Sequence, residues 1–183
     1  MGAKLVDKDL GFREWFKRAK ELKDARVHVG VLQDGKGGAE AVKGSKSNID
    51  TGEARVTLHQ ASGSITLAEL AAILEYGTED GRIPSRPAFQ MTFDEERERL
   101  VELGKKLIES FLKGRTSLDK ALGVMGSTFA AAVKKKITGG PGIPPPNAPA
   151  TVEAKGSSRP WVDTGRLVGA ISWAVHLGGS DTE

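Results

Sequence analysis

The fold is decided by residues 89–137, which read FQMTFDEERERLVELGKKLIESFLKGRTSLDKALGVMGSTFAAAVKKKI. In the first half, apolar side chains recur at helical spacing and form one stripe, made of Phe89, Phe93, Leu100, Leu103, Leu107 and Phe111. The second half keeps a four-three rhythm through Leu118, Leu122, Met125, Phe129, Ala132 or Val133, and Ile137. Because the intervening KGRTS is short, the stretch predicts two long helices that pack as an antiparallel hairpin.

The beginning of the chain predicts one helix and one strand. An amphipathic helix is expected over residues 9–23, with Asp9 as its N-cap and an apolar face made of Phe12, Trp15, Phe16, Ala19 and Leu22. Residues 26–33 read RVHVGVLQ, in which Val27, Val29 and Val31 alternate with other residues. This period of two predicts a strand.

The middle of the chain combines a loop, a strand and a short helix. Residues 34–53 have no periodicity and many Gly, Ser, Lys and Asp residues, which indicates a long mobile surface loop. Residues 54–60, ARVTLHQ, can form a second strand. Thr66 has a glutamate, Glu69, at capping-box spacing, and the LAELAAILEY that follows Thr66 predicts a short apolar helix ending at Gly77.

The residues after the hairpin predict a loop and a last strand. Residues 139–160 are rich in Pro and Gly and predict an extended, flexible loop. Residues 164–170 predict a short helical turn, and the alternation in AISWAVHL, residues 170–177, predicts a C-terminal strand. Together these elements predict a single α+β domain over residues 1–183. Its small, few-stranded, mainly antiparallel sheet would pack against long α-helices, with long mobile loops.

The composition is that of an ordinary globular chain and excludes several kinds of chemistry. The 183 residues hold 27 Lys and Arg against 24 Asp and Glu, an excess too small to imply avid phosphate binding by charge alone. The absence of cysteine excludes disulfides, thiolate zinc sites and cysteine nucleophiles. No apolar run approaches the roughly 20 residues of a membrane span, and charges stand where a signal peptide needs apolar residues. We therefore expect a protein kept in a cytoplasm, or in a particle assembled there, with no membrane partner.

The motifs of common enzyme classes do not occur in the sequence, which contains no GxxxxGK[ST], no GxGxxG after a strand and no HExxH. The carboxylates between Asp94 and Glu102 are interspersed with arginines on a predicted helix, which is typical of a solvated face. His28 and His176 lie on predicted strands and can meet in one sheet as ordinary histidines. Because no pattern in the sequence pairs a nucleophile with a general base, we expect a protein that is not an enzyme and that binds neither a cofactor nor a metal.

A proline corner joins the short apolar helix to the helical hairpin. Pro84 and Pro87 fix their own φ and restrict the residues before them, so the corner can present Arg82 and Arg86 in defined directions. An arginine held in this way can bind a carboxylate bidentately. That carboxylate can belong to the same chain, with Glu75 as the candidate, or to a neighbouring protein.

A second cluster, RPWVDTGRL, occupies residues 159–167. Asp163 or Thr164 can cap the helical turn that follows. Trp161 can pack against that turn, which leaves Arg166 facing outward. A tryptophan near an arginine is also a pair that recurs in binding hot spots. The cluster therefore predicts either a turn locked by its tryptophan or a contact with a partner.

Three blocks of the chain follow one another in a recognisable order: VHVGVL, LAELAAILEYGTEDGRIPSRPAF, and PPPNAPATVEAKGSSRPWVDTGRLVGAISWAV. In this order they resemble the neck and tail-completion proteins of tailed bacteriophages, a group that overlaps with phage virion morphogenesis and minor tail proteins. Such proteins carry an E[FY]GT block followed by an IPxRPF corner, and a late TGxL block followed by [SA]I. The matching residues here are Glu75, Tyr76, Gly77 and Thr78; Ile83, Pro84, Arg86, Pro87 and Phe89; and Asp163, Thr164, Gly165, Leu167 and Ile171.

The chain departs from this pattern at two positions, since Ala88 stands between Pro87 and Phe89, and Trp161 stands where an aliphatic residue is more usual. The resemblance implies a structural virion protein, assembled in the host bacterial cytoplasm, that forms a homo-oligomeric ring joining the capsid portal complex to the tail and letting DNA pass. Its partners would be further copies of itself and other connector and tail proteins.

In that reading, five residues are the candidate subunit or partner contacts: Glu75, Arg82, Arg86, Trp161 and Arg166. Three lysines at the end of the second long helix, Lys134, Lys135 and Lys136, either complement the helix dipole or make non-specific contacts with packaged DNA. A tail terminator or tail-tube component remains an alternative. A DNA-binding accessory protein is a further one.

Overall fold

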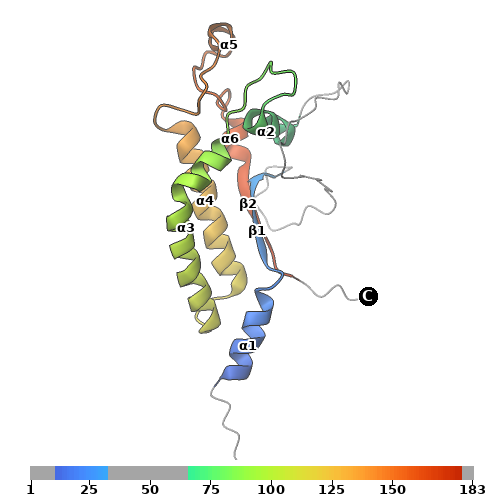
Figure 1. Ribbon diagram of the computed structural model, residues 1–183, viewed down its shortest axis with the longest axis vertical. Helices are drawn as coiled ribbons and strands as arrows, with labels where there is room; N and C mark the ends of the chain where they lie inside the picture. The colour runs from blue at the N-terminus through green and yellow to red at the C-terminus, as the bar shows by residue number, and fades with distance from the viewer. Residues whose placement is uncertain (1–10, 33–65, 179–183) are drawn as a thin grey trace, which may run out of the picture.

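The computed structural model describes residues 11–32 and 66–178, which form a long helical hairpin with a two-stranded sheet packed on one of its helices (Figure 1). In chain order the elements are α1 (Phe12–Glu21), β1 (Arg26–Val31), α2 (Leu67–Tyr76), α3 (Ala88–Leu112), α4 (Leu118–Thr138), α5 (Pro149–Lys155), α6 (Arg166–Ala170) and β2 (Ile171–His176). The predicted α+β class is confirmed.

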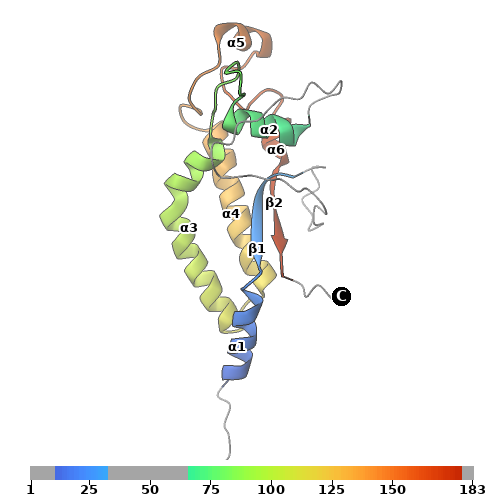
Figure 2. The same cartoon turned by 45° about the vertical axis from the view of Figure 1, so that its right-hand side comes forward.

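The helical hairpin is formed by α3 and α4, which run antiparallel and side by side in both views (Figures 1 and 2). Ser117 caps α4 by accepting the N–H of Lys120, as its position after a short turn favours. The rings of Phe93 and Phe129 meet edge to face across the hairpin, with centroids 6.0 Å apart. Helix α4 lies between α3 and the sheet, so it packs on two sides.

The sheet joins the two ends of the described chain, because β1 pairs antiparallel with β2 in a register that places Val29 opposite Trp173. The face of α4 toward the sheet carries the small buried residues Gly126, beside Trp173, and Ala130, in one cluster with Ile171, which let the strands approach closely. The rings of His28 and His176 meet on the sheet with centroids 4.8 Å apart, as the two predicted strands allow.

Gly126 packs closely against Trp173 of the sheet, and this contact yields a stability prediction. A Cβ at this position would lie 2.8 Å from side-chain atoms of Trp173, whereas a Cβ at Gly123 would lie 3.9 Å from the indole nitrogen of that residue. We expect Gly126→Ala to lower the free energy of unfolding by about 1–3 kcal/mol through overpacking. Gly123→Ala, the matched control, should raise it by up to about 1 kcal/mol through helix propensity. Urea denaturation of both variants measures this, and equal effects of the two would contradict the close packing.

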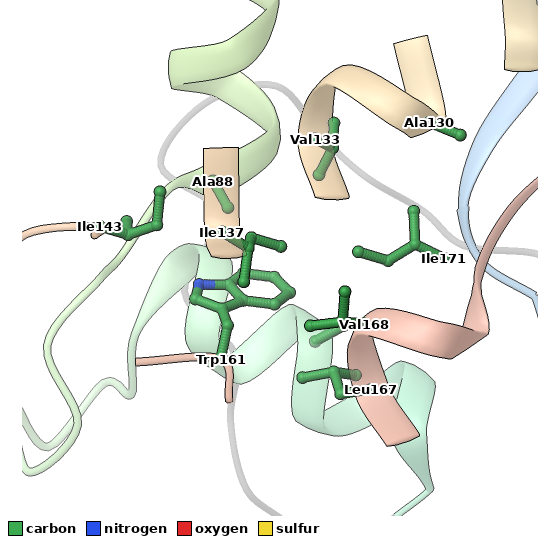
Figure 3. Packing of buried hydrophobic residues seen from close by; sticks show 10 residues of the cluster. Ala88, Ala130, Val133, Ile137, Ile143, Trp161, Leu167, Val168 and Ile171 are labelled. Atoms are coloured by element: carbon green, nitrogen blue, oxygen red, sulfur yellow. The ribbon is translucent and has the colours of Figure 1, made fainter. Parts of the chain in front are cut away.

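The hydrophobic core gathers at the end of the hairpin where α2, α4 and α6 meet (Figure 3). The indole of Trp161 occupies its middle, beside Ile137 of α4 and Ala88 at the start of α3. Around it lie buried aliphatic side chains from four further places in the chain: Ala71, Ile143, Leu167, Val168 and Ile171. Residues from 71 to 171 thus contribute to one cluster, which fixes the ends of α2, α3 and α6 relative to one another.

Most predicted boundaries are confirmed, and the N-terminal helix is shorter than predicted. Helix α1 begins after Gly11, which has φ 90° and makes no side-chain cap. The predicted cap Asp9, the loop over residues 34–53 and the strand over residues 54–60 lie outside the described residues. Helix α2 has the predicted capping box, with Thr66 Oγ1 accepting from Glu69 N and the Glu69 carboxylate accepting from Thr66 N.

Two predictions after the hairpin are wrong in detail. Residues 139–160 are not one extended loop, because they contain α5, which begins with Pro149 and ends at Gly156 in the left-handed conformation. The predicted helical turn is α6, and neither Asp163 nor Thr164 caps it. Its N-cap is Gly165, which has φ 79°. Glycine adopts this left-handed conformation without steric cost.

Candidate functional site

The proline corner, residues 77–87, is a closed loop in which short side chains form hydrogen bonds with backbone groups. Thr78 N donates to the carbonyl of Ile83 at 2.9 Å, and Ile83 N donates back to Thr78 Oγ1 at 3.0 Å. Gly77 has φ 77°, and a Cβ there would lie within 2.9 Å of the backbone of Ile83 and Ser85. Only glycine fits this position, which accounts for the glycine of the EYGT block.

Glu75 lies on the last turn of α2 and caps the start of α3. Its carboxylate accepts the backbone N–H groups of Phe89 and Gln90 at 3.0 and 2.9 Å. The N-cap residue of α3 is Pro87, which makes no side-chain cap, so a carboxylate from another helix takes that role. Burial raises the pKa of Glu75 above its ordinary value, against the opposing effect of these N–H groups.

Arg86 links the corner to three other segments. Its N–H donates to the carbonyl of Leu74 at 2.7 Å, which holds the corner against α2. Its guanidinium Nε and Nη2 donate to the carbonyls of Pro145 and Pro146 at 2.8 and 3.3 Å, in the proline-rich segment. Its own carbonyl accepts the indole N–H of Trp161 at 3.0 Å. One residue thus connects α2, residues 145–146 and the cluster before α6.

Trp161 anchors the late block in the core. Its side chain is 2% exposed, and its ring lies 5.9 Å from that of Phe89, measured between centroids. The residue has φ 67°, in the left-handed region that few residues other than glycine adopt. The hydrogen bond and the surrounding core hold it in this conformation.

The five candidate contact residues therefore divide into two groups. Glu75, Arg86 and Trp161 are 7%, 7% and 2% exposed, and each bonds within the chain. The expectation that these three contact a neighbouring protein is corrected, since buried side chains with internal partners hold the fold together. Arg82 and Arg166 are exposed. Arg82 pairs with Asp80 of its own loop at 3.2 Å, so a corner arginine does bind a carboxylate of the same chain, although that carboxylate is not the candidate Glu75.

The two corner arginines provide a direct test of this division. Arg86→Ala removes both side-chain hydrogen bonds to the proline-rich segment and should lower the free energy of unfolding by about 2–3 kcal/mol, as for buried bonds of a charged group. Arg82→Ala, the matched control, removes an exposed ion pair and should change it by less than about 1 kcal/mol. Thermal unfolding followed by circular dichroism measures both, and an equal loss in the two variants would contradict the assignment.

A second feature, an apolar groove of about 820 Å³, was missed by the sequence reasoning. Its sides are α3 and β1, its floor is α4 and Trp15 of α1 stands at one end; the lining includes Val27, Val29, Phe93, Leu100, Val101, Gly104, Ile108, Leu112, Met125 and Phe129. The signal was present in α3, where Val101 and Ile108 lie outside the predicted stripe. An apolar surface of this kind marks a contact with another molecule or segment.

Several charged side chains on α3 and α4 form ion pairs with one another. In the last turns of α4, Lys136 bonds the carboxylate of Glu95 on α3, while Lys135 is exposed and Lys134 half-buried. The predicted solvated face of α3 has ion pairs at helical spacing, such as Arg99 with Glu96 at 3.0 Å. Within the residues that the structure describes, no group of three His, Asp or Glu side chains could hold a metal ion.

Comparisons of this chain with protein-family models, with curated proteins and with solved structures found no match. Of the helices in residues 11–32 and 66–178, none combines the length and the apolar character needed to cross a membrane.

Proposed function

We propose that the protein is a structural subunit of a tailed-bacteriophage virion, which forms a homo-oligomeric ring joining the capsid portal complex to the tail. The observation that carries this proposal is how the three resembling blocks meet. Residues 27–31 of VHVGVL lie in β1 and pair with the end of the late block in β2. The corner of the middle block receives the indole N–H of Trp161 from the late block. The residues that carry the resemblance thus form one connected part of the fold.

The surface of the subunit also supports a role in an assembly. Large apolar side chains are exposed on several elements: Phe12, Trp15 and Phe16 on α1, Phe93, Val101 and Ile108 on α3, Val124 on α4 and Trp173 on β2. Exposed apolar surface of this extent is typical of proteins that bury it against partners. Arg82 and Arg166 remain the exposed candidate contacts of the ring, and Lys134 and Lys135 the candidate contacts with DNA.

The test is deletion of the gene in the phage or prophage that carries it, followed by negative-stain electron microscopy of induced lysates. Filled heads and full-length tails lying apart are the expected result. Tails of abnormal length would favour a tail terminator instead. Normal infectious particles would reject the structural role, and a DNA-binding accessory protein would then be tested by duplex binding that weakens steeply with salt.

Complementation with variants assigns the contacts. Arg166→Ala should reduce the number of joined particles while leaving the thermal unfolding of the purified protein unchanged, because the side chain is exposed. Unimpaired joining by this variant would remove Arg166 from the contact set.

A further inference from the structure

The apolar groove has the dimensions and the lining of a site for a helix. Its α3 side runs from Phe93 to Leu112, a span of about 28 Å at 1.5 Å per residue. Val101 in the middle of this side is 49% exposed, and the lining near it includes the apolar Leu100 and Ile108 as well as Arg97 and Lys105. Covering such side chains would remove apolar area from water, which favours association.

Helix α1 presents a matching apolar surface, on which Phe12, Trp15 and Phe16 are 67%, 45% and 48% exposed. None of its residues is buried, and the rings of Phe12, Trp15 and Phe16 lie together along one face, with Phe12 6.1 Å from each of the other two. A helix of ten residues is marginal in water without packing. Helix α1 is therefore an amphipathic helix that requires a partner surface.

The position of α1 prevents it from lying along its own groove. Arg18 donates to the carbonyl of Phe111 at 3.1 Å and stacks over the ring of that residue at 5.7 Å. These contacts hold α1 at the turn of the hairpin, from which it points away from α3 and α4 (Figure 2). Only Trp15 reaches the end of the groove. The aromatic face beyond it is available to another molecule.

The two surfaces match in their apolar character and not in their charge. Helix α1 carries four basic and two acidic residues, and the charged residues of the groove lining are Arg97, Lys105, Lys113 and Glu109. Association of the two surfaces therefore rests on the burial of apolar area. The same chain supplies both surfaces, so a second copy is the partner of matching chemistry.

We propose that α1 of one copy packs its Phe12, Trp15 and Phe16 face into the α3–α4–β1 groove of the next copy. The contact joins two different patches and is heterologous, so repetition closes a ring or extends a filament. That repetition closes a ring, and does not extend a filament, rests on the proposed function. The contact between the two copies rests only on the groove and on α1.

Site-directed cross-linking tests this contact without background, because the chain contains no cysteine. Lys17→Cys places a thiol beside the aromatic face of α1, and Lys105→Cys places one at the rim of the groove. The two single variants, one carrying an affinity tag, are mixed and treated with a bifunctional maleimide. A cross-linked product with the mass of one tagged and one untagged chain then joins two copies. Both substitutions leave the proposed apolar contacts in place.

Lys17→Cys mixed with Glu153→Cys is the control, because α5 lies at the opposite end of the molecule from α1 (Figure 1). We expect the groove pair to form on the order of tenfold more mixed product than the control pair, since docked thiols have a high effective concentration. The proposal would be overturned by equal yields from the two pairs at concentrations where any oligomer forms. It would also be overturned if the chain stayed monomeric and the groove pair gave no product above that of the control pair.

A second pair of variants separates contact from folding. Val101→Asp puts a charge into the groove, and Val124→Asp puts one at an exposed α4 position outside the groove lining; the two valines are 49% and 44% exposed. Both should melt close to the wild type, and only Val101→Asp should reduce the cross-linked product to the control level. Equal products from the two variants would show that the groove is not the contact.

The two proposals fail separately. If the groove pair cross-links but gene deletion leaves normal virions, the proposed self-association is retained and the virion role is rejected. Heads and tails lying apart after deletion, without groove cross-links, would keep the virion role and place the subunit contact elsewhere.

Discussion

Replacing Trp161 by alanine is expected to lower the free energy of unfolding by about 3–5 kcal/mol, the range for removal of a large buried aromatic side chain. The side chain is 2% exposed and lies at the centre of the cluster that joins α2, α4 and α6 (Figure 3). The substitution leaves a cavity and also removes the donor to the Arg86 carbonyl. Urea denaturation of the purified variant measures the loss, which is a large fraction of the roughly 5–15 kcal/mol that stabilises a domain.

Trp161→Phe is the matched control for the two contributions. It keeps an aromatic ring in the core but removes the indole N–H and part of the ring volume. We therefore expect a smaller loss of about 1–3 kcal/mol, from a smaller cavity and from the lost hydrogen bond to the Arg86 carbonyl, which still accepts the N–H of Ala88. Because Trp161 is buried, we expect Trp161→Ala to impair the folding of the subunit, and any loss of particle joining to follow from that. A Trp161→Ala protein as stable as the wild type would show that the core does not depend on this residue.

Glu75→Ala is expected to have the second largest effect, about 2–4 kcal/mol, because it removes two charge-assisted hydrogen bonds at the start of α3. The N–H groups of Phe89 and Gln90 would lose their acceptor while the surrounding corner stays closed. Thermal and urea unfolding both measure this loss. The exposed neighbour Glu79 provides a matched substitution, since Glu79→Ala should change the stability by less than about 1 kcal/mol.

The pH dependence of stability distinguishes the charge of Glu75 from its hydrogen bonds. Its pKa is raised in the folded protein by burial, so between the ordinary glutamate value and the raised pKa the folded state binds more protons than the unfolded state. The contribution of this group is thus fully present below its ordinary pKa and is lost as the pH rises through the raised pKa.

Glu75→Gln should abolish this part of the pH dependence while retaining an acceptor for one of the two N–H groups. The measurement is the free energy of unfolding of both proteins across the mildly acidic range. The wild type should lose stability relative to Glu75→Gln with rising pH, and a difference that stays constant or has the opposite sign would contradict the assignment.

The parts of the fold that follow from local pattern were predictable. Helical spacing located α3 and α4, the Thr66 capping box located the start of α2, and Gly77 located its end. Helix α5 was missed although its sequence, PATVEAK followed by glycine, has Pro at its first position and Gly after its end. The composition of the surrounding loop hid this local signal.

The contacts of the candidate site depend on residues far apart in the chain and were therefore not predictable from local pattern. Trp161 and Arg86 are 75 positions apart, and Arg86 and Pro145 are 59 apart. The sequence showed that Glu75 and Arg86 were unusual, but it did not show that one caps α3 and the other binds backbone carbonyls. The groove was likewise hidden, because it arises from the separation of α3 and β1 on either side of α4.

The pairing of β1 with β2 sets the order in which the chain can fold during its synthesis. The strands are separated by about 140 residues, so β1 leaves the ribosome several seconds or more before its partner exists. Helices α3 and α4 are complete by then, and they can form their hairpin from local contacts. The sheet closes last, and until it does, β1 has unpaired backbone groups of the kind that invite association with other chains. Faster release of the C-terminal segment, or a chaperone that covers β1, is therefore expected to raise the yield of folded protein.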